Sequence, residues 1–119
     1  MTQPTPSEPE RGERFTVAVA PAEDGAVGIR LGGELDLGAI PAFEAALGEL
    51  APDARAEVDL RELEFMDSSG VAALIQLDLR QRAGGGSVRC VVAPNGPVRK
   101  VVDLTRLAEM LEVVEAPSR

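Results

Sequence analysis

Histidine is absent from this chain of 119 residues, and its absence excludes several kinds of active site. A Ser-His-Asp triad and a Cys-His zinc site both need an imidazole, and so does a histidine base that titrates near neutral pH. A carboxylate base is still conceivable. The sequence nevertheless predicts a protein that is not an enzyme and that needs no cofactor.

Aromatic residues are scarce, because the chain has three phenylalanines and neither tryptophan nor tyrosine. The core is therefore expected to consist of Val, Leu, Ile and Ala. Twenty acidic residues against twelve basic ones give a formal net charge of −8. A chain with this charge, and without Trp or Tyr to stack on bases, is not expected to bind nucleic acid directly.

Cysteine occurs only once, so no internal disulfide can form. Cys90 lies in the apolar run 88–92, which favours a small buried thiol over a redox site. No run approaches the roughly 20 apolar residues of a membrane-spanning helix. The first 13 residues resemble neither a signal peptide nor a membrane anchor, so we expect a cytoplasmic protein without a membrane partner.

Hydrophobic periodicity predicts one domain at residues 14–115, between a disordered N-terminal tail, 1–13, and a C-terminal tail, 116–119. Strands are predicted at 15–19 and 27–31, joined as a hairpin, at 56–60 and at 88–93, with a last strand at 111–114 left open. Helices are predicted at 40–50, at 67–83 and after the turn 95–97. The order β-β-α-β-α-β-α(-β) indicates an α/β domain with a mixed, mostly parallel sheet and helices mainly on one face.

The second helix carries apolar residues on more than one side. One stripe suits packing on the sheet and consists of Ala72, Ile75, Leu79 and Ala83. Leu74 and Leu77 lie off this stripe and are expected to pack on a neighbouring helix. If either is exposed next to Ser68, it is a candidate anchor for a partner protein.

The segment Asp67-Ser68-Ser69-Gly70 begins the second helix. Asp67 is suited to be the N-cap, because its carboxylate can accept hydrogen bonds from the free amides of the first turn. On one interpretation the segment is only a well-capped helix start. On the other, a serine at an exposed helix N-terminus accepts a phosphoryl group, because the amides and the helix dipole favour negative charge there. These four residues alone do not decide between the two.

A wider pattern resembles the STAS-domain anti-sigma factor antagonists. The resemblance rests on Leu-Gly-Gly-Glu-Leu-Asp at 31–36, Val-Asp-Leu at 58–60, Phe-Met-Asp-Ser-Ser-Gly at 65–70 and the third helix at 98–105. It covers residues 15–114. The chain departs from the family at Val71-Ala72-Ala73, where a second glycine is common, and at Arg106, which stands where a glycine often precedes Leu107.

This resemblance implies a partner switch. An unmodified antagonist of this family binds an anti-sigma factor, which is also a serine kinase of the histidine-kinase-like ATPase fold, and thereby releases a sigma factor. The kinase phosphorylates the first serine after the aspartate, which is Ser68 here, and a PP2C-type phosphatase restores it. The resemblance also implies a partner-binding surface that includes Asp67, Ser69 and Gly70. Asp36 is expected near Ser68, either in this surface or only as a cap of the first helix.

Two alternatives belong to other functional classes. In the first, the chain is a STAS subunit of a transporter-associated or stress-sensing complex, and Ser68 only caps a helix. In the second, it is a small nucleotide-binding or hydrolytic protein that holds an anion at the helix N-terminus. The absence of Lys and Arg from residues 67–70 argues against the second.

Overall fold

Five strands lie in the sheet in the same order as in the chain. The computed structural model describes residues 14–48 and 50–117. Its strands are β1 (Phe15–Pro21), β2 (Val27–Leu35), β3 (Arg55–Met66), β4 (Ser87–Val92) and β5 (Glu112–Glu115). Its helices are α1 (Ile40–Leu47), α2 (Ser68–Ala83) and α3 (Arg99–Thr105), with 3₁₀ turns η1 (Glu23–Gly25), η2 (Leu37–Ala39) and η3 (Leu107–Glu109). The predicted element order is confirmed, including the last strand.

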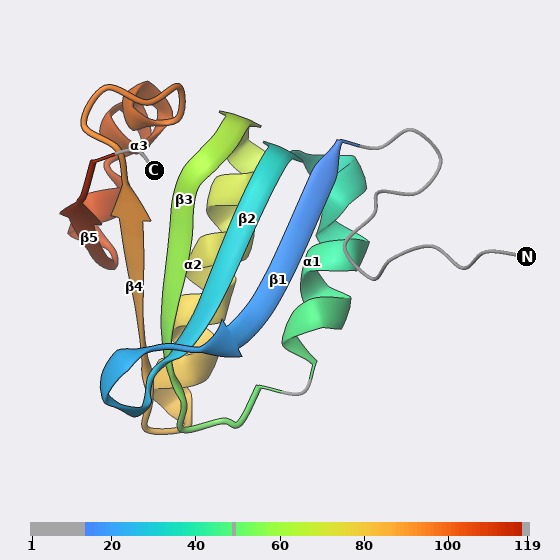
Figure 1. The fold of residues 1–119 in the computed structure, drawn as a ribbon, viewed down its shortest axis with the longest axis vertical. Coiled ribbons are helices and arrows are strands. Elements are labelled where there is room, and N and C mark those ends of the chain that lie inside the picture. The colour runs from blue at the N-terminus through green and yellow to red at the C-terminus, as the bar shows by residue number, and fades with distance from the viewer. Residues whose placement is uncertain (1–13, 49, 118–119) are drawn as a thin grey trace, which may run out of the picture.

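The sheet is mixed, as expected, because only the hairpin of β1 and β2 is antiparallel. Figure 1 shows α1 and α2 behind the sheet on one face, while α3 lies at the edge formed by β4 and β5. Apolar side chains fill the space between the sheet and these helices. Phe15 of β1 and Phe43 of α1 meet there edge to face, with ring centroids 6.5 Å apart.

β3 is much longer than the strand predicted at 56–60, and it continues through residues 61–66 almost to the start of α2. Its register with β2 shifts twice, and each shift places one extra β3 residue against β2. Such bulges reset the alternation of side chains. Leu60, Leu63 and Met66 are therefore all buried although they are three residues apart. A search for strict alternation misses a strand of this kind.

Gly33 occupies one of these irregular positions in β2. Its φ of +81° lies in the left-handed region, and a Cβ there would collide with the backbone of Arg14. The neighbouring Glu34 amide donates a hydrogen bond of 2.6 Å to the carbonyl oxygen of Arg14. Glycine thus lets β1 and the end of β2 approach closely, next to the Glu-Leu-Asp residues at 34–36.

The buried face of α2 differs from the predicted stripe. Ala72, Leu79 and Ala83 are exposed and Ile75 is half-buried, so that prediction was wrong. The buried face instead carries Gly70, Val71, Leu74, Leu77, Asp78 and Gln81. Both sides of α2 contain apolar residues, and the true face includes two polar ones, so periodicity could not identify it.

The two buried polar residues of α2 both have partners. The Gln81 amide donates hydrogen bonds to the carbonyl oxygens of Ala51, Pro52 and Ala54, and so fixes the loop that precedes β3. Asp78 accepts hydrogen bonds from Arg82 at 3.0 and 2.8 Å. These contacts satisfy side chains that would otherwise be costly to bury.

Two helix boundaries differ slightly from the predictions. α1 ends at Leu47 rather than at residue 50, and α3 begins at Arg99, after the predicted turn. Pro41 does lie in the first turn of α1, as expected. The predicted tail at 1–13 and residues 118–119 lie outside the described residues. Within the described part, the Ala116 amide bonds to the Val92 carbonyl oxygen at 2.9 Å, beyond the end of β5.

Candidate functional site

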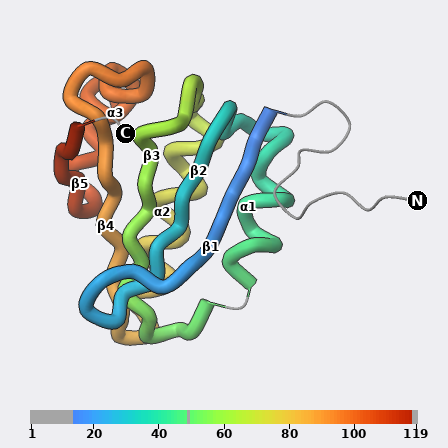
Figure 2. The backbone as a smooth tube through the Cα atoms, in the orientation of Figure 1, coloured from blue at the N-terminus to red at the C-terminus, as the bar shows by residue number. Residues whose placement is uncertain are grey.

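The candidate site lies where two parallel strands end side by side. Leu35 at the end of β2 pairs with Met66 at the end of β3, so Asp36 and Asp67 are the next residues of adjacent strands. The two strand ends lie together at the upper edge of the sheet in Figure 2. The fold thus brings together Asp36 and the segment 67–70, which are about 30 residues apart in the sequence.

Asp67 caps α2 as predicted. Its Oδ1 atom accepts hydrogen bonds from the amides of Ser69, at 2.9 Å, and Gly70, at 3.2 Å. Its own amide donates to the Leu35 carbonyl oxygen at 3.4 Å, which joins the start of α2 to the end of β2. Ser68, the first residue of the helix, is exposed, and Ser69 is half-buried.

Asp36 caps the turn that leads into α1. Its Oδ1 atom accepts a hydrogen bond of 3.1 Å from the amide of Ala39, the last residue of η2. The capping role and the position beside the start of α2 therefore occur together in the structure. Among the described residues, neither Asp36 nor Asp67 makes an ion pair, so this edge carries two carboxylates without a basic neighbour bound to them.

The structure does not support Leu74 as a partner-binding residue. Its side chain is completely buried, and that of Leu77 is also in the core. The condition under which either would anchor a partner is therefore not met. Both side chains belong to the buried face of α2, which packs in the core between the sheet and the helices.

Two exposed apolar residues near Ser68 escaped the sequence analysis. Leu37 follows Asp36 and is 72% exposed, and Phe65 lies on β3 two residues before Asp67 and is 47% exposed. The strand predicted at 56–60 ends before Phe65, so the sequence pattern assigns no face of the sheet to this side chain. No local signal in the sequence marks this exposure, because it depends on the irregular pairing of β3 with β2.

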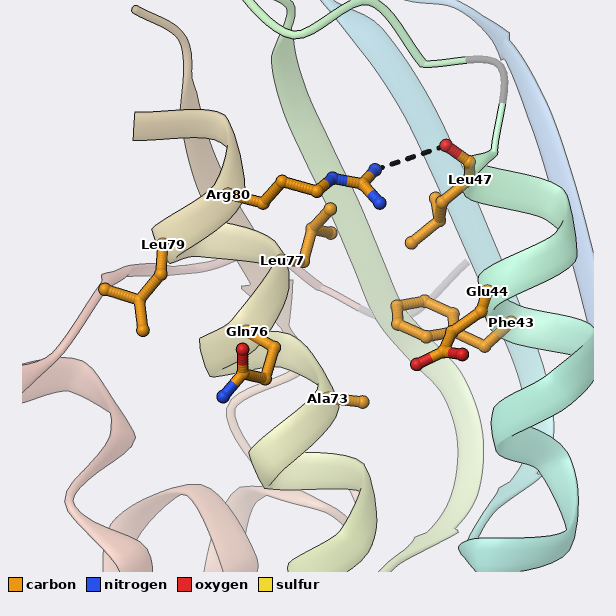
Figure 3. A pocket seen from close by; sticks show the side chains of 8 residues that line it. All are labelled: Phe43, Glu44, Leu47, Ala73, Gln76, Leu77, Leu79 and Arg80. Atoms are coloured by element: carbon orange, nitrogen blue, oxygen red, sulfur yellow. Dashed lines mark hydrogen bonds between the residues drawn. The ribbon is translucent and has the colours of Figure 1, made fainter. Parts of the chain in front are cut away.

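A groove between α1 and α2 is a separate feature (Figure 3). It has a volume of about 800 Å³, with Phe43, Leu47, Ala73 and Leu77 among its apolar lining. Arg80 reaches across it and donates a hydrogen bond of 3.2 Å to the Leu47 carbonyl oxygen. Of its lining residues, Leu77 was a conditional candidate in the sequence analysis, and the others are not predicted site residues.

The single cysteine, Cys90, is buried in the core. Burial, with a smaller contribution from Asp78, raises the pKa of the Cys90 thiol to about 12, so this thiol stays protonated at neutral pH. Residues 14–48 and 50–117 contain no group of three or more His, Cys, Asp or Glu side chains arranged to hold a metal ion. In the same residues, no helix is long and apolar enough to cross a membrane.

A family model described as "Mlab, STAS domain" matches residues 19–114. Among solved structures, an anti-sigma factor antagonist from Mycobacterium paratuberculosis is 25% identical, with a TM-score of 0.72 over 84% of this chain and 85% of that one. The unphosphorylated form of the anti-sigma factor antagonist SpoIIAA is 26% identical, with a TM-score of 0.68 over 85% of this chain and 88% of that one.

A putative anti-sigma factor antagonist from Thermotoga maritima has the same fold, with a TM-score of 0.71 at 18% identity, over 84% of this chain and 86% of that one. A search of curated protein sequences returns no match.

Proposed function

Because this chain belongs to the STAS-domain family, we propose that it is a non-enzymatic anti-sigma factor antagonist that acts in the cytoplasm. In its unmodified form it binds an anti-sigma factor that is also a serine kinase of the histidine-kinase-like ATPase fold. Phosphorylation of Ser68 by that kinase ends the binding, and a PP2C-type phosphatase restores it. The observation that carries the proposal is the exposed Ser68 at a capped helix start, beside Asp36, in a fold shared with proteins described as anti-sigma factor antagonists.

The exposure of the two serines supports Ser68 as the modified residue. Ser68 is exposed, whereas Ser69 is half-buried and its amide is held by Asp67. A kinase has to place the hydroxyl oxygen in line with the γ-phosphate of ATP, which requires access from outside. That access is available at Ser68 without unwinding the helix.

The cap also determines what an added phosphate would meet. Oδ1 of Asp67 already accepts hydrogen bonds from the amides of Ser69 and Gly70, which are the groups that usually hold an anion at a helix start. A phosphate on Ser68 carries roughly −1.5 to −2 charges and lies next to Asp67, in a chain of net charge −8. The domain offers little to neutralise it locally, so it remains hydrated. A partner that covers this surface has to remove that water at a high energetic cost.

The test is the intact mass of the protein after incubation with purified anti-sigma kinases and ATP, followed by mapping of the modified residue. We expect one added phosphate on Ser68, which Ser68→Ala prevents and Ser69→Ala permits. Modification of Ser69 instead would overturn the assignment. If no anti-sigma kinase binds or modifies the protein, the proposed function itself is wrong.

A second candidate is a STAS subunit of a transporter-associated or stress-sensing complex without a phosphorylation switch. Two observations favour it: the matching family model is not described as an anti-sigma factor antagonist, and the Asp67 carboxylate already accepts the Ser69 and Gly70 amides without any phosphate. In this case the same incubation leaves the mass unchanged, and Ser68→Asp has no effect on association with the other subunits.

A further inference from the structure

Phe65 is unusual among the three aromatic residues of this chain. Phe15 and Phe43 are buried and pack against one another, whereas Phe65 is 47% exposed. It pairs with Glu34 in the register of β2 and β3, one position before the pair of Leu35 and Met66 that ends both strands. Its neighbour Met66 is buried against the helices, and successive side chains of a strand point to opposite faces. Phe65 therefore projects on the open face, at the edge where Ser68 lies.

Leu37 is the second large apolar residue exposed at this edge. It follows Asp36 directly and begins η2, so the hydrogen bond from the Ala39 amide to Asp36 fixes the turn that carries it. Its side chain is 72% exposed and lies on an ordered turn. Because this turn is already ordered, its backbone loses little conformational freedom when a partner covers Leu37.

We call residues 36, 37, 65, 67 and 68 the Ser68 surface. It combines two exposed apolar side chains with the carboxylates of Asp36 and Asp67, which have no ion-pair partner among the described residues. Protein interfaces commonly have this composition, with a few apolar anchors surrounded by polar or charged groups. The complementary surface is an apolar depression bordered by Lys or Arg side chains.

We propose that Phe65 and Leu37 are the anchors through which this domain binds its partner, and that the partner is the anti-sigma kinase inferred above, so the proposal rests on that function. The two side chains enter an apolar depression of the kinase, and basic residues around it face Asp36 and Asp67. A phosphate on Ser68 acts on the same contact, because a hydrated dianion at the border keeps water next to the apolar side chains. This contact takes the place of the one expected from Leu74.

Matched substitutions test the anchors. Leu37→Ala and Phe65→Ala remove them, while Leu79→Ala and Met110→Ala are controls of comparable exposure, at 54% and 44%. Leu79 lies roughly 16 Å along the helix axis from Ser68. The Met110 carbonyl oxygen accepts a hydrogen bond of 3.1 Å from Arg82, near the other end of α2. Both controls are therefore remote from the Ser68 surface.

Affinity is measured by calorimetry with the kinase that modifies wild-type protein in the mass assay. We expect each anchor variant to bind at least tenfold more weakly, and each control within twofold of wild type. Wild-type affinity in both anchor variants would overturn this inference and leave the proposed function intact. Failure of the wild-type protein to bind any anti-sigma kinase would overturn the proposed function, and this inference with it.

A second measurement covers the case in which Phe65→Ala lowers stability. A photo-reactive phenylalanine analogue is placed at position 37, 65 or 79 of the otherwise unchanged chain, and the complex with the kinase is irradiated. Crosslinks from 37 and 65 but not from 79 support the anchors. Crosslinks from 79 alone would overturn them.

Discussion

The first turn of α2 packs so closely on β2 that a Cβ on Gly70 would stand 2.7 Å from the carbonyl oxygen of Leu35. The same atom would lie 2.7 Å from the side chain of Met66. This contact sets the start of α2 against the strand that delivers Asp36. Gly70 is therefore a positioning residue for the Ser68 surface as well as part of the core.

Gly70→Ala is expected to destabilise the domain by about 1–3 kcal/mol, because overpacking forces the backbone of α2 away from Leu35. The free energy of unfolding is measured by urea denaturation. Gly48→Ala is a suitable control, because a Cβ there would meet no atom closer than 3.4 Å. Equal stability of the two variants would show that the close packing at Gly70 can relax freely.

Asp36 caps the turn that precedes α1, and we expect its charge to contribute to recognition by the kinase as well. Two substitutions separate these roles. Asp36→Ala loses the hydrogen bond from the Ala39 amide and should cost about 0.5–2 kcal/mol of stability, whereas Asp36→Asn keeps a good capping group. Both remove the negative charge. We expect both variants to be phosphorylated more slowly than wild type, although only the alanine variant melts earlier. A wild-type phosphorylation rate in Asp36→Asn would leave Asp36 with the capping role alone.

Phosphorylation of Ser68 is expected to weaken partner binding strongly and to change stability by less than about 1 kcal/mol. The effect on the fold is small because Ser68 is exposed, and repulsion from Asp67 opposes the favourable helix dipole. Binding is measured by calorimetry and stability by thermal melting, for wild type, the phosphorylated protein, Ser68→Ala and Ser68→Asp. Ser68→Ala cannot be phosphorylated at this position and should therefore bind the kinase constitutively. Unchanged affinity of the phosphorylated protein would rule out the switch.

The buried thiol predicts a loss of stability in alkaline solution. Burial raises the pKa of Cys90 from 9.0 to about 12, so between these values the unfolded chain releases a proton that the folded chain keeps. The corresponding contribution to stability is complete below pH 9 and is lost as the pH rises toward 12. Over this range the equilibrium constant for unfolding increases by up to tenfold per pH unit. Cys90→Ala should lack this contribution. Urea denaturation of both proteins at pH 8 and pH 10 measures the difference.

Local signals made the beginning and end of α2 predictable. Asp67 is a strong N-cap and the glycines at 84–86 end the helix, so the sequence indicated residues 67–83 and the structure has Ser68–Ala83. The same cap residues did not by themselves identify the site at 67–70, which was predicted from the wider pattern that resembles the STAS-domain antagonists. Its proximity to Asp36 was expected from the resemblance alone, and the structure gives the physical reason, which is the parallel pairing of the ends of β2 and β3.

The features that escaped prediction depend on contacts between distant segments. The packing of Gly70 on Leu35 and the hydrogen bonds from Gln81 to residues 51–54 determine which face of α2 is buried. The hydrophobic periodicity of the helix contains no information about these contacts. The length of β3 depends on two bulges that exist only in its pairing with β2. Because Phe65 lies in that irregular strand, its exposure could not be foreseen either.

The order of the strands has a consequence for synthesis on the ribosome. Each strand pairs with the one made just before it, so the sheet can grow at one edge as the chain emerges. β1 and β2 close first as a hairpin, and no strand has to wait for a segment made much later. The surface that carries Asp36 and Ser68 is completed when α2 follows β3, before β4 and β5 are made. β4 then covers the free edge of β3, which would otherwise be open to pairing with other chains.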